Sequence, residues 1–299
     1  MREHALSHDA KTALAQTVIG VINTGSGSAT ADAAGRMTEI FADAGLQNAS
    51  VVCVGPSEIE QTLADAAASA DVIVILGGDG TIRSAAEKCG GSGKLIMPLP
   101  GGTMNMLPHA LFGNLPWDQA LIATLASPAV CNVSGGMVEG HPFFCAAILG
   151  APALWADARE ALRDGDIVEA GKRAVTAARR SSELLDYELG QEKSGEAAAV
   201  AIICPLVSDV MEAHEPAFEA AALMPVVAGE MFRLAFHTIF DGWRQDPSVE
   251  LARVKTVRVS GHGRVPVILD GEKVYLGRVV RVTFVPVAFR ALIPSGPAS

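Results

Sequence analysis

The chain has 299 residues and a formal net charge of −10, with 23 Lys and Arg against 33 Asp and Glu. So acidic a balance argues against general nucleic-acid binding, which leaves a basic footprint, and disfavours attraction of the whole molecule to an anionic membrane. Because 49% of the residues are hydrophobic and 19% are charged, we expect a packed core, in one large domain or two medium ones.

The first third of the chain alternates short apolar runs with amphipathic segments. The runs are rich in Val, Ile and Leu, as in strands buried on both faces, and they cover residues 17–23, 50–54, 72–76 and 95–99. Helical periodicity covers residues 30–44, 58–70 and 81–89. This alternation predicts right-handed crossovers and a doubly wound parallel sheet, the hallmark of an α/β unit.

Local signals mark the ends of these helices. Ser57 and Glu60 match the S-x-x-E capping box at a helix start. Gly45 and Gly90 stand where helices should stop.

The pattern changes after about residue 130. Residues 132–149 predict a hairpin that turns at Gly140, and a long helical stretch is expected from Trp155 to Leu185. Segments of strand length and strand pattern follow, at residues 198–206, 254–261, 265–277 and 279–287. A second, mainly antiparallel domain fits this order best.

Cysteine usage and hydropathy indicate the compartment. The five cysteines are far apart, odd in number and mostly within apolar runs, so we expect buried free thiols in a reducing compartment. Residues 1–16 lack the apolar core of a signal peptide. Proline and glycine interrupt the uncharged stretches at 95–117 and 140–156, which disfavours a spanning helix. We expect a soluble, cytoplasmic protein.

A glycine-rich motif, GGDGT, occupies residues 77–81 at the end of the third apolar run. Ligands bind at the carboxyl ends of strands in an open parallel sheet. Glycines allow a close backbone approach, and the N–H groups that begin a helix favour an anion, so the position suits phosphate. Asp79 would repel a bare triphosphate, which implies a metal ion or a proton to be accepted. The alternative is that Asp79 only caps the helix.

A second glycine pair follows the next predicted strand, in the segment PLPGGTMNML at residues 98–107. Two such loops at adjacent strand ends should face one crevice. The intervening GGSGKL at residues 90–95 resembles a phosphate-binding P-loop, but no Ser or Thr follows Lys94 and a strand comes next. We interpret it as a helix-to-strand loop.

The order GGDGT, PGGTMN and a distant LDGE at residues 269–272 resembles the diacylglycerol kinase catalytic-domain superfamily, which includes bacterial lipid kinases, sphingosine kinases and ceramide kinases. VINTGSGSA at residues 21–29 is similar to the first strand and nucleotide loop of that family. The resemblance extends from about residue 18 to residue 293.

This resemblance implies a two-domain lipid kinase. A Rossmann-like α/β domain would cover residues 1–132, with the tail 287–299 returning to it, and a β-sandwich for the lipid substrate would cover residues 133–286. The implied cofactors are ATP and Mg²⁺, without a protein-only metal site. The nucleotide-binding positions would be Asn23, Thr24, Gly25, Ser26 and Gly27, then Gly77, Gly78, Asp79, Gly80 and Thr81, then Gly102, Thr103 and Asn105.

The DGE stretch has two interpretations. Asp-Gly between apolar runs is by itself a hairpin signal, and Glu272 would then be an ordinary strand residue. The resemblance instead makes Glu272 the candidate base that accepts the proton of the lipid hydroxyl. Asp79 is the rival for that role. Either carboxylate would contribute about 10²–10⁴-fold.

The chain departs from the family pattern at several positions. Thr24 replaces the usual proline, and the threonine that usually ends the second strand is missing from CVGPSE. The family's G-[FI]-D element is interrupted after Gly150, and of the acids of its metal loop only Glu219 is kept in AFEAAALMP. We therefore predict no structural Mg²⁺ there, and the lipid acceptor stays open.

The alternatives are a nucleotide- or lipid-binding protein of this fold without catalysis, and an NAD kinase, which shares GGDG but usually adds an Asn-Glu dipeptide that is absent here. For the kinase we expect ATP and a lipid as partners, no nucleic acid, and transient contact at the inner membrane face. A second copy of the same chain, in a homodimer, is one further possible partner. Lys172, Arg173, Arg179 and Arg180 could contact anionic headgroups or form a solvated helix face.

Overall fold

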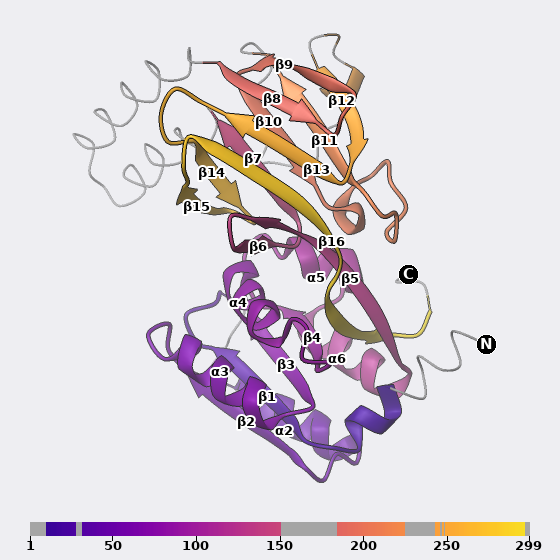
Figure 1. The fold of residues 1–299 in the computed structure, drawn as a ribbon. Helices are drawn as coiled ribbons and strands as arrows, with labels where there is room; N and C mark the ends of the chain where they lie inside the picture. The colour runs from indigo at the N-terminus through magenta and orange to yellow at the C-terminus, as the bar shows by residue number, and fades with distance from the viewer. Residues whose placement is uncertain are drawn as a thin grey trace. The chain divides into compact units, whose positions relative to one another are not determined.

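The computed structural model describes residues 10–27, 32–150, 184–224, 243–245, 247 and 249–296. The chain divides into two compact units (Figure 1). One contains residues 1–134 together with 286–299, and the other contains residues 135–285. Strands β5 (Pro128–Val138) and β16 (Val279–Pro294) each run through a boundary between the units.

The first unit is built on a parallel sheet in the order β2-β1-β3-β4. Its strands are β1 (Val18–Asn23), β2 (Ala49–Val54), β3 (Val72–Gly77) and β4 (Leu95–Pro100). The end of β16 adds a parallel partner to β4, with Arg290 opposite Leu95. Its helices are α2 (Ala33–Asp43), α3 (Ile59–Ser69), α4 (Asp79–Cys89), α5 (Met106–Phe112) and α6 (Trp117–Ala126).

Burial explains why the apolar runs become strands of this sheet. Every residue of β3 and β4 is buried, so both faces of the sheet must be covered. Helix α2 contacts α6, whereas α3 contacts α4, and these helix pairs provide the cover. The predicted α/β fold with a parallel sheet is confirmed.

The helix-end predictions are partly right. Gly45 follows α2 with φ +72°, and the Leu46 N–H donates to the Phe41 carbonyl, as in a Schellman end. The capping box is wrong. Among the described residues no side chain caps α3, which begins at Ile59. The Glu60 carboxylate instead accepts a hydrogen bond from Lys88 Nζ of α4 at 2.7 Å, and this ion pair lowers its pKa.

The second unit consists of antiparallel strands in two sheets. One has the order β12-β11-β10-β7-β14-β15 and the other contains β8, β9, β13 and the first part of β16. Strand β6 pairs with β5. The strands of this unit are β6 (His141–Phe143), β7 (Ala146–Gly150), β8 (Leu185–Leu189), β9 (Lys193–Ala197), β10 (Ala199–Ile203), β11 (Phe218–Leu223), β12 (Val249–Val254), β13 (Thr256–Ser260), β14 (Pro266–Leu269) and β15 (Glu272–Tyr275). Short 3₁₀ turns cover Pro205–Val207 and Trp243–Gln245.

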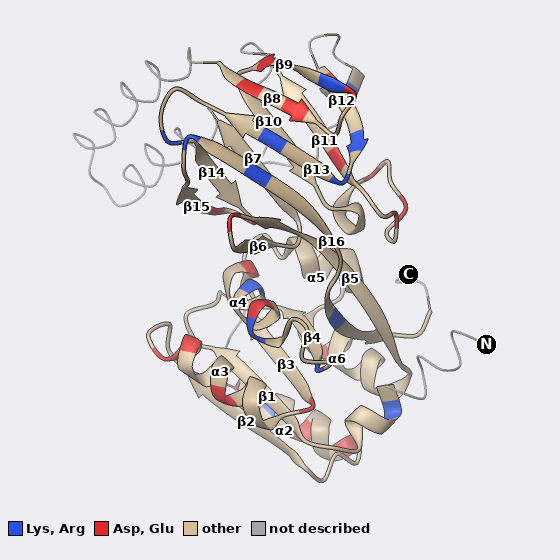
Figure 2. Ribbon diagram, viewed as in Figure 1, with Lys and Arg blue, Asp and Glu red and all other residues tan. Residues whose placement is uncertain are grey.

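The core of this unit lies between its two sheets. Leu149 and Val267 of one sheet belong to the same buried cluster as Tyr187 and Val280 of the other, so the predicted β-sandwich is confirmed. Strand β8 alternates buried and exposed residues. Its outward acidic residues lie beside the neighbouring strand β13, where a basic residue faces them (Figure 2), and the Arg258 guanidinium donates to the Glu188 carboxylate at 2.6 Å.

The predicted turn at Gly140 is present. Val138 pairs with His141, and the two residues between them, Glu139 and Gly140, have φ angles of +47° and +88°. Two successive positive φ angles define a type I′ hairpin turn. Strands β8, β9, β11 and β12 were not predicted from the sequence. Leu185, expected to end a helix, lies in β8, and Leu184 before it is not helical. Residues 155–183 of the predicted helix, which include its four basic residues, lie outside the described residues.

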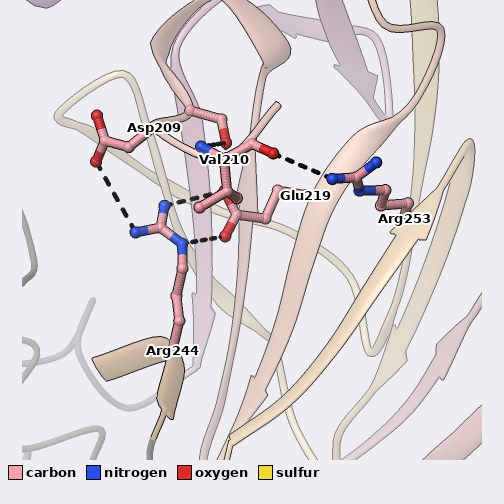
Figure 3. Close-up of polar contacts among 6 residues, drawn as sticks. Asp209, Val210, Glu219, Arg244 and Arg253 are labelled. Atoms are coloured by element: carbon pink, nitrogen blue, oxygen red, sulfur yellow. Dashed lines mark hydrogen bonds and ion pairs between the residues drawn. The ribbon is translucent and has the colours of Figure 1, made fainter. Parts of the chain in front are cut away.

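A buried ion pair holds Glu219, the residue that the sequence resemblance compares with an acid of a metal loop (Figure 3). Its side chain lies on β11 and is almost fully buried. The Arg244 guanidinium donates through Nε to one carboxylate oxygen and through Nη2, at 3.0 Å, to the other. Ser208 Oγ donates to the carboxylate at 2.6 Å, and Asp209 lies 3.8 Å from the guanidinium. These acids raise the pKa of Arg244, with the Glu219 hydrogen bond as the main cause.

We predict that Arg244→Met will lower the free energy of unfolding by about 3–5 kcal/mol, because it leaves a buried carboxylate without its cation. Urea unfolding measures the loss. Arg253→Met is the matched control, since Arg253 forms an exposed pair with Glu215 at 3.0 Å and such pairs contribute about 0–1 kcal/mol. Equal losses in the two variants would contradict the prediction.

All five cysteines are free thiols. Cys89, Cys145 and Cys204 are buried as expected, and burial raises the pKa of Cys89 to about 11. Cys53 is exposed, which corrects the expectation for that residue, because β2 is the edge strand of its sheet. None of the described helices is both long enough and apolar enough to cross a membrane.

Candidate functional site

Three loops follow neighbouring strands at the carboxyl edge of the parallel sheet. The end of β1 and the loop after it hold Asn23, Thr24, Gly25, Ser26 and Gly27. The junction of β3 with α4 holds Gly77, Gly78, Asp79, Gly80 and Thr81, and the loop from β4 to α5 holds Gly102, Thr103 and Asn105. Because β3 pairs with both β1 and β4, the three loops lie side by side.

Polar side chains connect the first loop to the second. Asn23 Oδ1 accepts the Gly25 N–H at 3.0 Å, and its Nδ2 donates to Thr81 Oγ1 at 2.9 Å. Ser26 Oγ accepts the Gly78 N–H at 3.2 Å. Thr24, which stands where the family has proline, donates through its N–H and its hydroxyl to the Val54 carbonyl at the end of β2. The first loop is therefore held against both neighbouring strands.

Backbone contact between the second and third loops requires glycine. The Gly101 N–H donates to the Gly77 carbonyl at 3.0 Å. A Cβ on Gly101 would lie 2.6 Å from the Gly77 nitrogen, and a Cβ on Gly102 would lie 2.7 Å from the Gly78 Cα. No side chain fits at either position, so these two glycines bring the loops together.

Gly78 differs from its neighbours, because the fold does not need a glycine there. Its φ of −80° and ψ of 174° are extended backbone that any residue adopts. A Cβ on Gly78 would meet only the Gly102 Cα, at an ordinary 3.6 Å, among the described residues. Gly78 therefore has room for a Cβ at the start of α4, where the N–H groups of the helix favour a phosphate.

We predict that Gly102→Ala will lower the free energy of unfolding by about 1–3 kcal/mol, since backbone must move to relieve the overlap. It should also weaken nucleotide binding, because the two glycine loops separate. Gly78→Ala is the matched control. It should keep the stability of the wild type and lose only nucleotide affinity. Urea unfolding and calorimetry measure both quantities, and a Gly102→Ala protein as stable as the wild type would contradict the packing argument.

Asn105 shapes the third loop from within. Its backbone is left-handed, with φ +49° and ψ +41°, and the residue is buried. Both polar atoms of its side-chain amide form hydrogen bonds with the backbone of Gly102. Its Oδ1 accepts the Gly102 N–H at 2.8 Å and its Nδ2 donates to the Gly102 carbonyl at 2.9 Å. Thr103, by contrast, is exposed. A ligand would therefore contact Thr103, while Asn105 supports the loop.

Asp79 does not cap its own helix. It is the first residue of α4, and among the described residues no side chain caps that helix. Burial raises the pKa of Asp79, whereas hydrogen bonds from the backbone N–H groups of Leu107, Met106 and Asn105, and the charge of His109, act in the opposite direction. The carboxylate thus faces the start of α5. This helix was not predicted from the sequence, although Pro108 in its first turn is typical of a helix start.

One carboxylate oxygen of Asp79 remains unused. Oδ1 is buried and has no hydrogen-bond partner among the described residues. A buried unpaired carboxylate oxygen is costly, and such groups are concentrated at functional sites. It suits a metal ion or the hydroxyl of a substrate.

Two further motif predictions concern loops outside this cluster. Lys94 of GGSGKL donates to the Ala70 carbonyl, in a loop between α4 and β4 where Gly91 and Gly93 have positive φ. This agrees with a helix-to-strand loop. Glu272 is the exposed first residue of β15 and pairs with Leu269 across the turn. Asp79 and Glu272 lie in different units.

The fold and the glycine loops define a class of proteins with a parallel α/β unit and a β-sandwich. Residues 17–131 match the family model of the diacylglycerol kinase catalytic domain. The resemblance read from the motifs is thus confirmed over these residues.

Solved structures show the same fold over both units. A structure described as a diacylglycerol kinase from Bacillus anthracis str. Sterne is 14% identical, with a TM-score of 0.67, and the match covers 94% of this chain and 97% of that one. A second structure from the same organism is 15% identical, with a TM-score of 0.70 and coverage of 94% and 98%. At this identity the likeness concerns the fold alone.

Proposed function

We propose that the protein is a lipid kinase that transfers the γ-phosphoryl group of ATP to the hydroxyl of a lipid, either diacylglycerol-like or sphingoid. The observation that carries this proposal is the meeting of three loops at Gly78, in the middle loop that also holds the buried, unpaired oxygen of Asp79. The match of residues 17–131 to the model of the diacylglycerol kinase catalytic domain supports it.

The first unit would bind the nucleotide. The three loops supply the N–H groups at the start of α4, the hydroxyls of Ser26 and Thr81, and the exposed Thr103. Oriented N–H groups at a helix start favour phosphate. The Gly78 N–H, which now donates to Ser26 Oγ, would donate to a phosphate oxygen instead.

The residues present fit a Mg²⁺ ion that arrives with the nucleotide. Within the described ranges, no group of three or more His, Cys, Asp or Glu residues could hold a metal by itself. Mg²⁺ at phosphate sites uses one or two carboxylates together with waters and phosphate oxygens, and the Asp79 Oδ1 offers one such ligand. When bound, the ion would neutralise charge on the phosphates.

The transfer needs one proton acceptor. The lipid oxygen attacks the γ-phosphorus, the bond from phosphorus to the bridging oxygen of ADP breaks, and the hydroxyl proton passes to a carboxylate. We propose Glu272 as this base, with Asp79 as the alternative. The second unit would then hold the lipid. A lipid acceptor also implies a cytoplasmic protein that works transiently at the inner membrane face.

The test is incubation of purified protein with labelled ATP, Mg²⁺ and extracted membrane lipids. Transfer of label to a lipid, lost in Asp79→Ala, would support the proposal. The binding-protein alternative predicts that ATP binds by calorimetry while no lipid of a broad panel is labelled. Mass spectrometry of lipids that co-purify with the protein would identify the acceptor class.

A further inference from the structure

The side chain of Asp270, next to the proposed base, is bound to backbone. Its Oδ2 accepts the Phe144 N–H at 2.7 Å, and its Oδ1 accepts the N–H groups of Cys145 and Ala146 at 2.8 and 2.9 Å. Three consecutive amides therefore converge on one carboxylate. Hydrogen bonds from N–H groups to a charged acceptor are about twice as strong as neutral ones.

The backbone of Asp270 is equally constrained. Asp270 and Gly271 have φ angles of +49° and +89° and form the two-residue turn between β14 and β15. This is the type I′ geometry, which favours Asn or Asp followed by Gly. The Asp270 N–H also donates to the Ala146 carbonyl at 2.9 Å. Main chain and side chain of one residue thus fasten the β14–β15 hairpin to the segment 144–146.

That segment is itself held in place. Phe144 and Cys145 are buried, and the Cys204 N–H at the end of β10 donates to the Cys145 carbonyl at 2.8 Å. The hairpin end is therefore connected to β7 and, through Cys145, to β10. Glu272 follows the turn directly and closes it opposite Leu269.

We propose that Asp270 is a positioning residue that fixes the hairpin end from which Glu272 acts. This inference rests on the proposed function, in which Glu272 is the base. Asp270 itself is assigned no proton transfer, because both of its carboxylate oxygens already accept backbone hydrogen bonds.

Asp270→Asn separates the side-chain contacts from the turn. Asn-Gly forms a type I′ turn as readily as Asp-Gly, so the hairpin turn is retained. An amide has only one acceptor oxygen, whereas both oxygens of Asp270 are used, so its NH₂ group must face at least one backbone N–H. The variant should therefore loosen the contact to segment 144–146 without breaking the turn.

The structural arm of the experiment is amide hydrogen exchange in the full chain. In the wild type, the amides of Phe144, Cys145 and Ala146 should exchange as slowly as amides within the β7–β14 ladder. Asp270→Asn should accelerate them, whereas Asp186→Asn, which removes an exposed carboxylate on β8, should not. Fast exchange in the wild type, or exchange unchanged in the variant, would overturn the inference whether or not the protein is a kinase.

The kinetic arm tests positioning. We expect Asp270→Asn to lower kcat by about 10²-fold through displacement of the base, with KM for ATP unchanged. Because Asp270 acts through Glu272, the double variant with Glu272→Gln should be no more than about twofold slower than Glu272→Gln alone. Independent, multiplying losses would overturn the inference. Absence of transfer in the wild type would instead refute the proposed function and leave the exchange result as the test of Asp270.

Discussion

Asp79→Asn is expected to lower kcat for phosphoryl transfer by about 10²–10⁴-fold, the range for loss of a group that accepts a proton in the transition state. The same loss follows if Asp79 binds the metal ion, because the developing charge is then less well neutralised. The physical basis is the buried Oδ1 of Asp79, which has no partner among the described residues. Steady-state kinetics with a labelled lipid measure the effect.

Asp79→Asn should also make the protein more stable at neutral pH. Burial raises the pKa of Asp79 in the folded state, so ionisation disfavours folding. This penalty is absent below the unfolded pKa of about 3.9 and grows as the pH rises through the folded pKa. The gain in the variant should therefore be present at pH 7 and disappear as the pH approaches the unfolded value. Urea unfolding across that range measures it.

The two readouts together distinguish a functional carboxylate from a structural one. A carboxylate that served only to fasten α5 would lower stability when replaced, and activity would fall only with folding. Asp43→Asn, at the exposed end of α2 in the same unit, is the matched control and should change neither quantity. An active Asp79→Asn protein would refute both roles proposed for this residue.

The α/β unit was predictable because its signals are local. The Val-, Ile- and Leu-rich runs became β1 to β4 with boundaries shifted by one residue at most, since strands buried on both faces need continuous apolar sequence. Strand β11 was not predictable in this way. Its sequence FEAAAL is rich in alanine and lacks β-branched residues, yet every residue is buried between β10 and β12. Tertiary burial overrode a weak local preference.

The candidate site was predictable as a set of loops but not as a set of contacts. Glycine pairs after adjacent strands indicated convergence, and the Gly101–Gly77 contact agrees with it. The sequence did not reveal that Asn105 supports its own loop, or that Asp79 faces the start of α5. Both facts depend on which way a side chain points across a turn, and motif spacing does not encode this.

Glu272→Gln is expected to lower kcat by about 10²–10⁴-fold as well, since it removes the proposed base. The affinity for ATP should not change, because the glycine loops lie in the first unit and Glu272 lies in the second. Calorimetry with ATP and kinetics with a labelled lipid separate the two quantities. Glu196→Gln, at an exposed position of β9, is the matched control.

The dependence of kcat on pH decides between the two carboxylates. A base must be ionised, so the rate rises with pH through its pKa. If Asp79 is the base, the rise lies above the ordinary range of an aspartate, because burial raises its pKa, and it persists in Glu272→Gln. If Glu272 is the base, the rise of kcat with pH disappears in Glu272→Gln. The Asp79→Asn variant then keeps the rise but reaches a lower maximum kcat. A Glu272→Gln protein with wild-type kcat would exclude Glu272 as the base and make the DGE segment a hairpin turn alone.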